Sequence, residues 1–200
     1  SEAELVLSDA VGADGSHMMF SSNDTPACEY ALANKLGAII NLDDITHISF
    51  LEGIIGKDFP EIMSCRYNPG GVFTLSNGIM DNPGDAKYGM TRMQLFEAYR
   101  QLRDHGVRKF GIHAFLASNT LSNEYYPKLA GQLFELVAEI REKLGIEFAF
   151  VNLSGGVGVD YKPEDPCNDI AAIGEGVRKE FERVLVPAGM GDVAVYTEMG

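Results

Sequence analysis

A glycine-rich loop is the feature of this sequence most suited to binding a ligand. The segment Ser154-Gly155-Gly156-Val157-Gly158 directly follows an apolar run, Phe148–Leu153. Glycine lets the backbone approach a ligand closely, so successive N–H groups of such a loop can bind a phosphate. A tight turn with positive φ between a strand and a helix would require the same glycines. The motif therefore predicts either a phosphate site or a structural turn.

Two charged residues, Arg66 and Glu198, stand at or after the ends of other β-rich runs. Arg66 suits a phosphate or carboxylate, because a guanidinium binds either group through two parallel N–H bonds. Its alternative role is a structural ion pair with Asp43, Asp44 or Glu198. Glu198 suits a general base or an anionic partner for a cationic ring nitrogen, with pairing to Arg66 or solvent exposure as the alternatives.

His113 and Phe115 are two residues apart in one β-rich run, so we expect them to face the same side of a strand. A histidine and an aromatic ring at the mouth of a barrel can flank a planar cofactor. The alternative is a core histidine that hydrogen-bonds to a neighbouring group.

The elements that position these residues are strands and helices in alternation. The predicted strands are nearly continuous apolar runs, as expected for parallel strands that are covered on both faces. They are His17–Ser22, Ala38–Leu42, Ile62–Tyr67, Phe110–Phe115, Phe148–Leu153 and Val193–Thr197.

Helix signals lie between these runs. Capping residues mark three of the helices, and an apolar face marks the long helix over residues 123–143. The predicted helices are Ala3–Val11, one from Pro26 to Gly37, one capped by Asp43 or Asp44, one from the Thr91-x-x-Gln94 capping box to Gly106, Asn123–Lys143 and Asp169–Val186.

The alternation predicts a parallel α/β fold, either a doubly wound sheet or a (β/α)8 barrel. No Gly-x-Gly-x-x-Gly follows the first strand, which argues against a dinucleotide-binding fold. Six predicted strands are fewer than the eight of a barrel. We expect a single domain over residues 1–200, a partial barrel of about six parallel strands that is truncated at both ends and lacks the first strands.

Composition excludes several functional classes. The 200 residues carry a net charge of −13, which disfavours nucleic acid and anionic lipid as partners. No apolar run is long enough to span a membrane and no signal peptide is visible, so we expect a cytoplasmic protein. The three cysteines and four histidines are scattered, and no metal site is expected.

Four segments resemble, in order along the chain, the motifs of one enzyme family. They are Lys87-Tyr88-Gly89, the run from Gly111 to Ser118, Ser154–Gly158 and Glu198-Met199-Gly200. The chain resembles the barrel domain of the pyridoxal-phosphate-dependent decarboxylases that share a fold with alanine racemase, with diaminopimelate decarboxylase as the nearest group.

The resemblance implies pyridoxal 5'-phosphate as cofactor and assigns roles by position. Glu198 would pair with the pyridine nitrogen and keep it protonated, and Glu198 and His113 are the implied catalytic residues. Gly156 and its neighbours would bind the cofactor phosphate, assisted by Gly200, with Ser118 close by. The full set of implied cofactor-binding residues is Arg66, Phe115, Ser118, Gly155, Gly156, Glu198, Met199 and Gly200.

The chain departs from the family pattern at several positions. Phe115 replaces the histidine that stacks on the pyridine ring, and Met199 replaces a proline. Ser154 replaces the first glycine of the phosphate loop, which is tolerable if its φ is negative. The family's Schiff-base lysine, its Tyr-x-x-Lys-Ala element and its C-terminal β-domain are absent, so we expect this chain alone to be inactive.

The resemblance implies decarboxylation of meso-diaminopimelate to L-lysine, in lysine biosynthesis, by a homodimer that takes a small amino-acid substrate. Ornithine, arginine and carboxynorspermidine are alternative substrates. Two other classes stay open: a barrel enzyme that binds a sugar phosphate at Gly155–Gly158 without this cofactor, and a non-enzymatic cofactor carrier.

Overall fold

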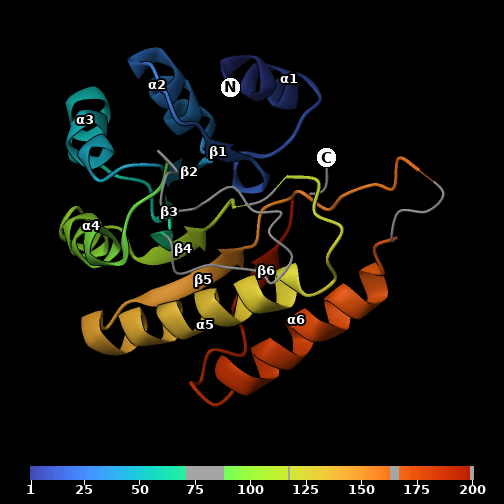
Figure 1. Ribbon diagram of the computed structural model, residues 1–200. Coiled ribbons are helices and arrows are strands. Elements are labelled where there is room, and N and C mark those ends of the chain that lie inside the picture. Colours follow the sequence, from blue (N-terminus) through green and yellow to red (C-terminus); the bar gives the residue numbers. More distant parts are fainter. Residues whose placement is uncertain (71–87, 117, 163–166, 199–200) are drawn as a thin grey trace. The chain divides into compact units, whose positions relative to one another are not determined.

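The computed structural model describes residues 1–70, 88–116, 118–162 and 167–198. The chain divides into two compact units, one of Ser1–Asn68 with Lys87–His113 and one of Pro69–Ala86 with Ala114–Gly200. Each unit contains parallel strands and helices (Figure 1). A single domain over residues 1–200 stays a prediction.

The first unit alternates helices and strands as the sequence predicts. Its elements are α1 (Glu2–Ala10), the 3-10 turn η1 (Gly15–His17), β1 (Met19–Ser21), α2 (Ala27–Leu36), β2 (Ile39–Leu42), α3 (Thr46–Ile55), β3 (Ile62–Arg66), α4 (Arg92–Asp104) and β4 (Lys109–His113). The strands pair in parallel and in chain order, β1-β2-β3-β4. A doubly wound sheet reverses its strand order, whereas a barrel adds strands in sequence, so this order favours the barrel.

The strands of this unit bury two chemically different faces. Tyr99 of α4 packs edge-on against Phe110 of β4, with ring centroids 5.6 Å apart, so Phe110 faces the helices. Strand register places Ile40, Met63 and Phe110 side by side on that apolar face. The alternate residues are buried too, but they are polar: Asn41, Ser64, Arg66 and His113. Parallel strands thus carry a polar layer on the face away from the helices.

Helix ends agree with the sequence signals. Thr91 and Gln94 form the predicted capping box of α4. Gly37 ends α2 in the left-handed conformation with φ of 74°. Asp44 Oδ1 accepts a hydrogen bond from the backbone N–H of Thr46 at the start of α3 (2.8 Å). These local contacts satisfy backbone groups that a helix end leaves unpaired.

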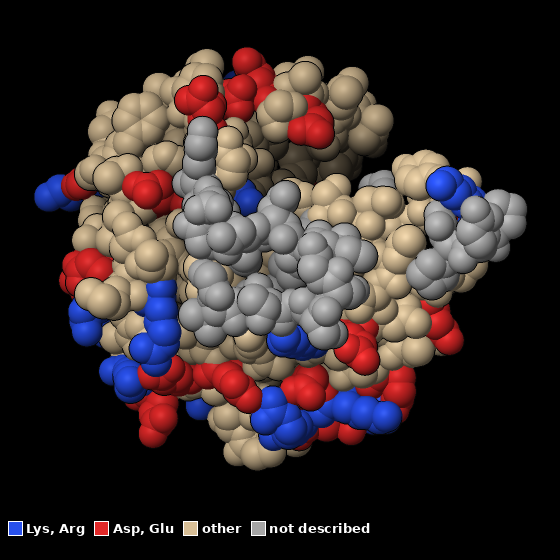
Figure 2. Space-filling model, in the orientation of Figure 1, with Lys and Arg blue, Asp and Glu red and all other residues tan. Residues whose placement is uncertain are grey.

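The second unit contains α5 (Tyr125–Leu144), β5 (Glu147–Asn152), α6 (Ile170–Val184) and β6 (Ala194–Tyr196). β5 and β6 pair in parallel, with Asn152 opposite Tyr196. Asp169, where the predicted helix begins, caps α6 by accepting a hydrogen bond from the N–H of Ala172. Basic and acidic side chains alternate over α5 and α6 in the lower part of Figure 2, where Arg183 contacts Glu135 and Glu180.

Two predicted strand boundaries are wrong by two residues, and several others differ by one. His17 lies in η1, because Asp14 accepts a hydrogen bond from Ser16 N and closes a turn there. β4 ends at His113, short of the predicted Phe115. Tyr67 N, just after β3, still donates to the carbonyl of His113 at 2.7 Å, but Asn68 N donates to the carbonyl of Met90 instead.

No described helix is both long and apolar enough to cross a lipid bilayer. Within the described residues, no three side chains of the histidine, cysteine, aspartate or glutamate type gather closely enough to hold a metal ion.

Candidate active site

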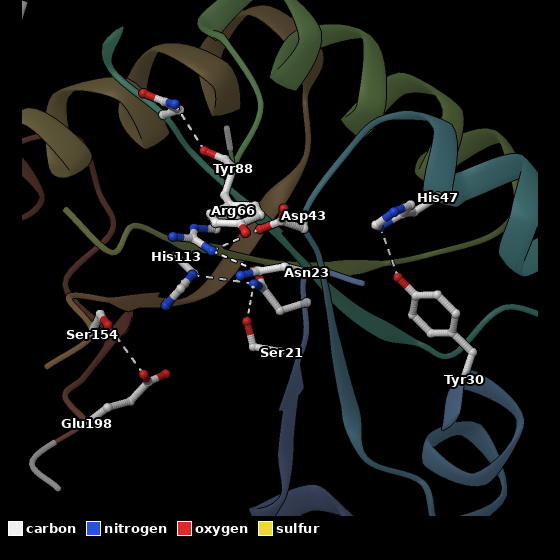
Figure 3. Close-up of polar contacts among 12 residues, drawn as sticks. Ser21, Asn23, Tyr30, Asp43, His47, Arg66, Tyr88, His113, Ser154 and Glu198 are labelled. Atoms are coloured by element: carbon white, nitrogen blue, oxygen red, sulfur yellow. Dashed lines mark hydrogen bonds and ion pairs between the residues drawn. The ribbon is translucent and has the colours of Figure 1, made fainter. Parts of the chain in front are cut away.

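Arg66 forms a buried polar group with residues from the ends of neighbouring strands (Figure 3). Its Nη1 donates to Asp43 Oδ1 at 3.0 Å and to Asn23 Oδ1 at 2.9 Å. The Tyr88 ring covers the guanidinium, 5.5 Å from its carbon to the ring centroid. Both charged side chains are less than one-tenth exposed. The ion pair with Asp43 confirms the structural alternative for Arg66, and its role in ligand binding stays a prediction.

The charge of Asp43 depends on this pairing. Burial raises the pKa of Asp43, while the Arg66 charge, the Arg66 hydrogen bond and the N–H of Gly89 oppose that rise. A buried carboxylate without a cation would be strongly destabilised. Arg66 and Asp43 therefore hold each other in one orientation at the carboxyl ends of β3 and β2.

His113 is buried at the end of β4 and is neutral at physiological pH. Its Nδ1 lies 3.3 Å from Asn41 Nδ2, which also donates to Ser21 Oγ at 3.0 Å (Figure 3). Burial, and to a lesser degree the Arg66 charge, lowers the pKa of His113 to about 3. The amide of Asn41 thus joins β1 and β4 across the polar layer and orients the imidazole.

The glycine loop of the second unit pairs with the backbone of Thr120. Thr120 N donates to Gly156 O at 2.8 Å, and Gly158 N donates to Thr120 O at 2.7 Å. Among the residues that the structure describes, the N–H groups of Gly155, Gly156 and Val157 have no acceptor. Three successive N–H groups without acceptors fit a phosphate, which supplies several acceptor oxygens.

Ser154, the first residue of this loop, differs from the expectation. Its φ is +58°, not negative, so the condition stated for replacing glycine is not met. Ser154 N donates to Asn152 Oδ1 at 2.8 Å, and this contact favours the turned conformation. A Cβ at the next residue, Gly155, would collide with the carbonyl oxygen of Glu198, so only glycine fits there.

Glu198 lies beyond the end of β6, beside this loop. Its two carboxylate oxygens accept hydrogen bonds from Asn152 Nδ2 at 2.8 Å and from Ser154 Oγ at 3.3 Å. Figure 3 shows the contact with Ser154. Glu198 N also donates to Ser154 O at 2.9 Å. Glu198, Ser154 and Gly155 are therefore brought together within the second unit, while the carboxylate stays exposed.

The other predicted residues are placed as follows. Phe115 is 44% exposed and lies outside β4, so strand alternation does not set its direction. Ser118 is exposed, two residues before Thr120, whose backbone pairs with the glycine loop. Met199 and Gly200 lie outside the described residues. Convergence of all these residues on one pocket stays a prediction.

Sequence reasoning missed the asparagines. Asn41 and Asn152 are buried, and each links residues discussed above. Their signal was a lone amide inside an apolar run, as in Ile40-Asn41-Leu42. A buried amide needs partners, so such a position indicates a polar neighbour on the same face.

A family model covers the whole chain. Residues 1–200 match the model described as "Pyridoxal-dependent decarboxylase, pyridoxal binding domain". The chain belongs to this family. The resemblance seen in its motifs is thereby confirmed.

The curated relatives that this chain matches are about twice its length. Protein TabA of Pseudomonas amygdali pv. tabaci is 33% identical over 185 residues, which cover 92% of this chain and 43% of that protein. The diaminopimelate decarboxylase of Thermoplasma acidophilum is 28% identical over 183 residues, with 92% and 44% covered. The chain thus spans less than half the length of these relatives.

Solved structures show the same fold for this family member. Diaminopimelate decarboxylase from Helicobacter pylori matches 100% of this chain and 49% of its own, with a TM-score of 0.84 and 19% identity. The enzyme from M. jannaschii matches 99% and 46%, with a TM-score of 0.86 and 16% identity. This likeness confirms the predicted α/β fold class, part of a (β/α)8 barrel with parallel strands.

Proposed function

We propose that the protein carrying this chain is a pyridoxal-phosphate-dependent decarboxylase that converts meso-diaminopimelate to L-lysine. Membership of the pyridoxal-dependent decarboxylase family supports the reaction class. Relatives named diaminopimelate decarboxylase support the substrate. The observation that carries the proposal is the run of N–H groups at Gly155, Gly156 and Val157, beside the Glu198 carboxylate.

These groups fit the proposed cofactor. The loop offers hydrogen-bond donors to a phosphate, and Glu198 offers a carboxylate to a protonated ring nitrogen. When bound, pyridoxal 5'-phosphate supplies an electron-accepting ring that stabilises the negative charge left on the substrate carbon as carbon dioxide departs.

Each proposed residue has a distinct task. Gly155 and Gly156 bind the phosphate through N–H groups, and Glu198 holds the proton on the ring nitrogen, so that the ring withdraws electrons more strongly. His113 acts as a neutral imidazole, because its pKa of about 3 keeps it uncharged at pH 7. The other residues proposed to bind the cofactor are Arg66, Phe115, Ser118, Met199 and Gly200.

We also propose that the protein is a homodimer in the cytoplasm that takes a small amino acid and binds neither nucleic acid nor membrane. The negative net charge of −13 supports the exclusion of polyanionic partners. Size measurement in solution tests the assembly.

The decisive test uses the full-length protein that carries this chain. Purified protein with pyridoxal 5'-phosphate is expected to release carbon dioxide and form lysine from meso-diaminopimelate. Ornithine, arginine and carboxynorspermidine are assayed in parallel, and faster turnover of any of them would reassign the substrate. Absence of turnover with all four, together with no cofactor absorbance band, would refute the proposed function.

A further inference from the structure

Ser154 holds a backbone conformation that L-amino acids rarely adopt. Its φ is +58°, and its side chain is buried, with the residue 2% exposed. Glycine would occupy this position without the steric cost of a Cβ atom. Strained residues of this kind cluster at functional sites, where the surrounding structure enforces them. The side chain of Ser154 should therefore do something that glycine cannot.

The contact that glycine would lose is the one to Glu198. Ser154 Oγ donates to Glu198 Oε2 at 3.3 Å, while Asn152 Nδ2 donates to Oε1 at 2.8 Å. Asn152 Oδ1 in turn accepts from Ser154 N at 2.8 Å. One asparagine thus fixes both the carboxylate and the residue that provides its second donor. All of these contacts lie within the second unit.

Glu198 lies at an exposed position after the end of β6, so hydrogen bonds help to fix the orientation of its side chain. A glutamate side chain loses considerable rotational freedom when it is held in one orientation. Hydrogen bonds to a charged group are stronger than those between neutral groups and can offset that loss.

We propose that Ser154 and Asn152 are positioning residues that hold the Glu198 carboxylate, one oxygen each, facing the ring nitrogen of the bound cofactor. This inference rests on the proposed function, because the ring nitrogen belongs to the proposed cofactor. This role gives a reason for a serine, rather than a glycine, at a position with positive φ.

The test compares two cofactors in the full-length protein. Pyridoxal 5'-phosphate and its 1-deaza analogue have the same phosphate, but in the analogue carbon replaces the ring nitrogen. The ratio of their dissociation constants isolates the contact with Glu198. We expect Ser154→Gly and Ser154→Ala each to reduce the preference for the natural cofactor by about three- to tenfold, the effect of one ordinary hydrogen bond, because the 3.3 Å contact is longer than a strong charge-assisted bond.

The two variants control for each other. Both remove the hydroxyl, but Ser154→Ala keeps a Cβ at positive φ, whereas Ser154→Gly relieves that strain. Chemical denaturation should therefore show Ser154→Gly to be the more stable variant, while the loss of cofactor preference is equal in the two. Asn152→Asp removes the other donor and sets a second carboxylate against Glu198, so it should reduce the preference further.

The outcomes separate this inference from the proposed function. If the unaltered protein does not bind pyridoxal 5'-phosphate saturably, the proposed function fails and this inference fails with it. If it binds the cofactor and both Ser154 variants keep the full preference over the deaza analogue, the proposed function stands and only the positioning role is refuted.

Discussion

At the scale of single residues, the polar groups of this chain depend on partners buried with them. Arg66 and Asp43 are both less than one-tenth exposed as side chains, and each neutralises the charge of the other. Removing one member of such a pair leaves an uncompensated charge in a poorly solvated place. Removing one member of this buried pair should therefore lower the free energy of unfolding more than removing one member of an exposed pair does.

Asp43→Asn is therefore expected to lower the free energy of unfolding by about 3 kcal/mol. The amide keeps the shape and an acceptor oxygen of the carboxylate, so the loss reports on charge. Urea denaturation measures it. Glu61→Gln is the matched control, because it removes an exposed partner of Lys109 at 3.7 Å and should change the free energy by less than about 0.5 kcal/mol. Equal effects of the two variants would contradict the prediction.

His113 predicts a specific pH dependence of stability. Burial lowers its pKa from 6.5 to about 3. Between these values the unfolded chain takes up a proton that the folded chain does not. Stability therefore falls as the pH drops from 6.5, by up to about 1.4 kcal/mol per pH unit from this group.

His113→Gln should remove that contribution. The difference in unfolding free energy between the unaltered chain and the variant, followed from pH 7 to pH 4.5 by urea denaturation, is expected to shift steadily in favour of the variant as the pH falls. His17→Gln is the control, since the side chain of His17 is 81% exposed. A difference that stays constant across this pH range would show that His113 takes up its proton without burial cost.

At the scale of elements, local signals predicted the fold well. The capping box at Thr91, the left-handed Gly37 and the apolar face of α5 are set by residues close in the sequence, and the structure has all three. The predicted strand through Phe115 failed, because pairing after His113 depends on residues far along the chain. The positive φ of Ser154 was missed although a local contact, Ser154 N to Asn152 Oδ1, favours it, because serine itself rarely adopts that conformation.

The polar partners show this limit most clearly. The sequence identified Arg66 and Glu198 by their types, and it included Asp43 among the possible partners of Arg66. It did not identify Asn41 or Asn152, because an amide inside a strand gains meaning only from the neighbours that register brings beside it. Candidate site residues were therefore easier to recognise by their types than the buried amides that hydrogen-bond to them were.

The capping box of α4 is a local device with a measurable contribution. Thr91 N donates to Gln94 Oε1 at 2.9 Å, and Thr91 Oγ1 accepts from Gln94 N. Thr91→Ala is expected to lower the free energy of unfolding by about 1 kcal/mol. Met93→Ala in the same first turn, at a residue 83% exposed, should have almost no effect. Thermal or urea denaturation of both variants shows whether stability is lost through the cap or through any surface substitution in this turn.

At the scale of the whole molecule, the chain carries the motifs that we propose bind the cofactor, but not the lysine-containing element that the resemblance led us to expect. It spans less than half the length of the relatives it matches. No Tyr-x-x-Lys-Ala occurs among its 200 residues. Binding the cofactor phosphate and attaching the cofactor covalently are separable tasks. This chain contains the residues proposed for phosphate binding.

Three lysines of this chain, Lys35, Lys109 and Lys143, are poorly placed to attach the cofactor covalently. Lys109 is the first residue of β4, and active sites of parallel barrels lie at the opposite, carboxyl ends of the strands. Lys35 and Lys143 stand in the last turns of α2 and α5, and Lys143 contacts Glu139. We therefore predict that the 200-residue chain, mixed with pyridoxal 5'-phosphate and meso-diaminopimelate, releases no carbon dioxide above a protein-free control. The full-length protein assayed beside it should release carbon dioxide readily, and turnover by the chain alone would show that one of its own lysines serves the reaction.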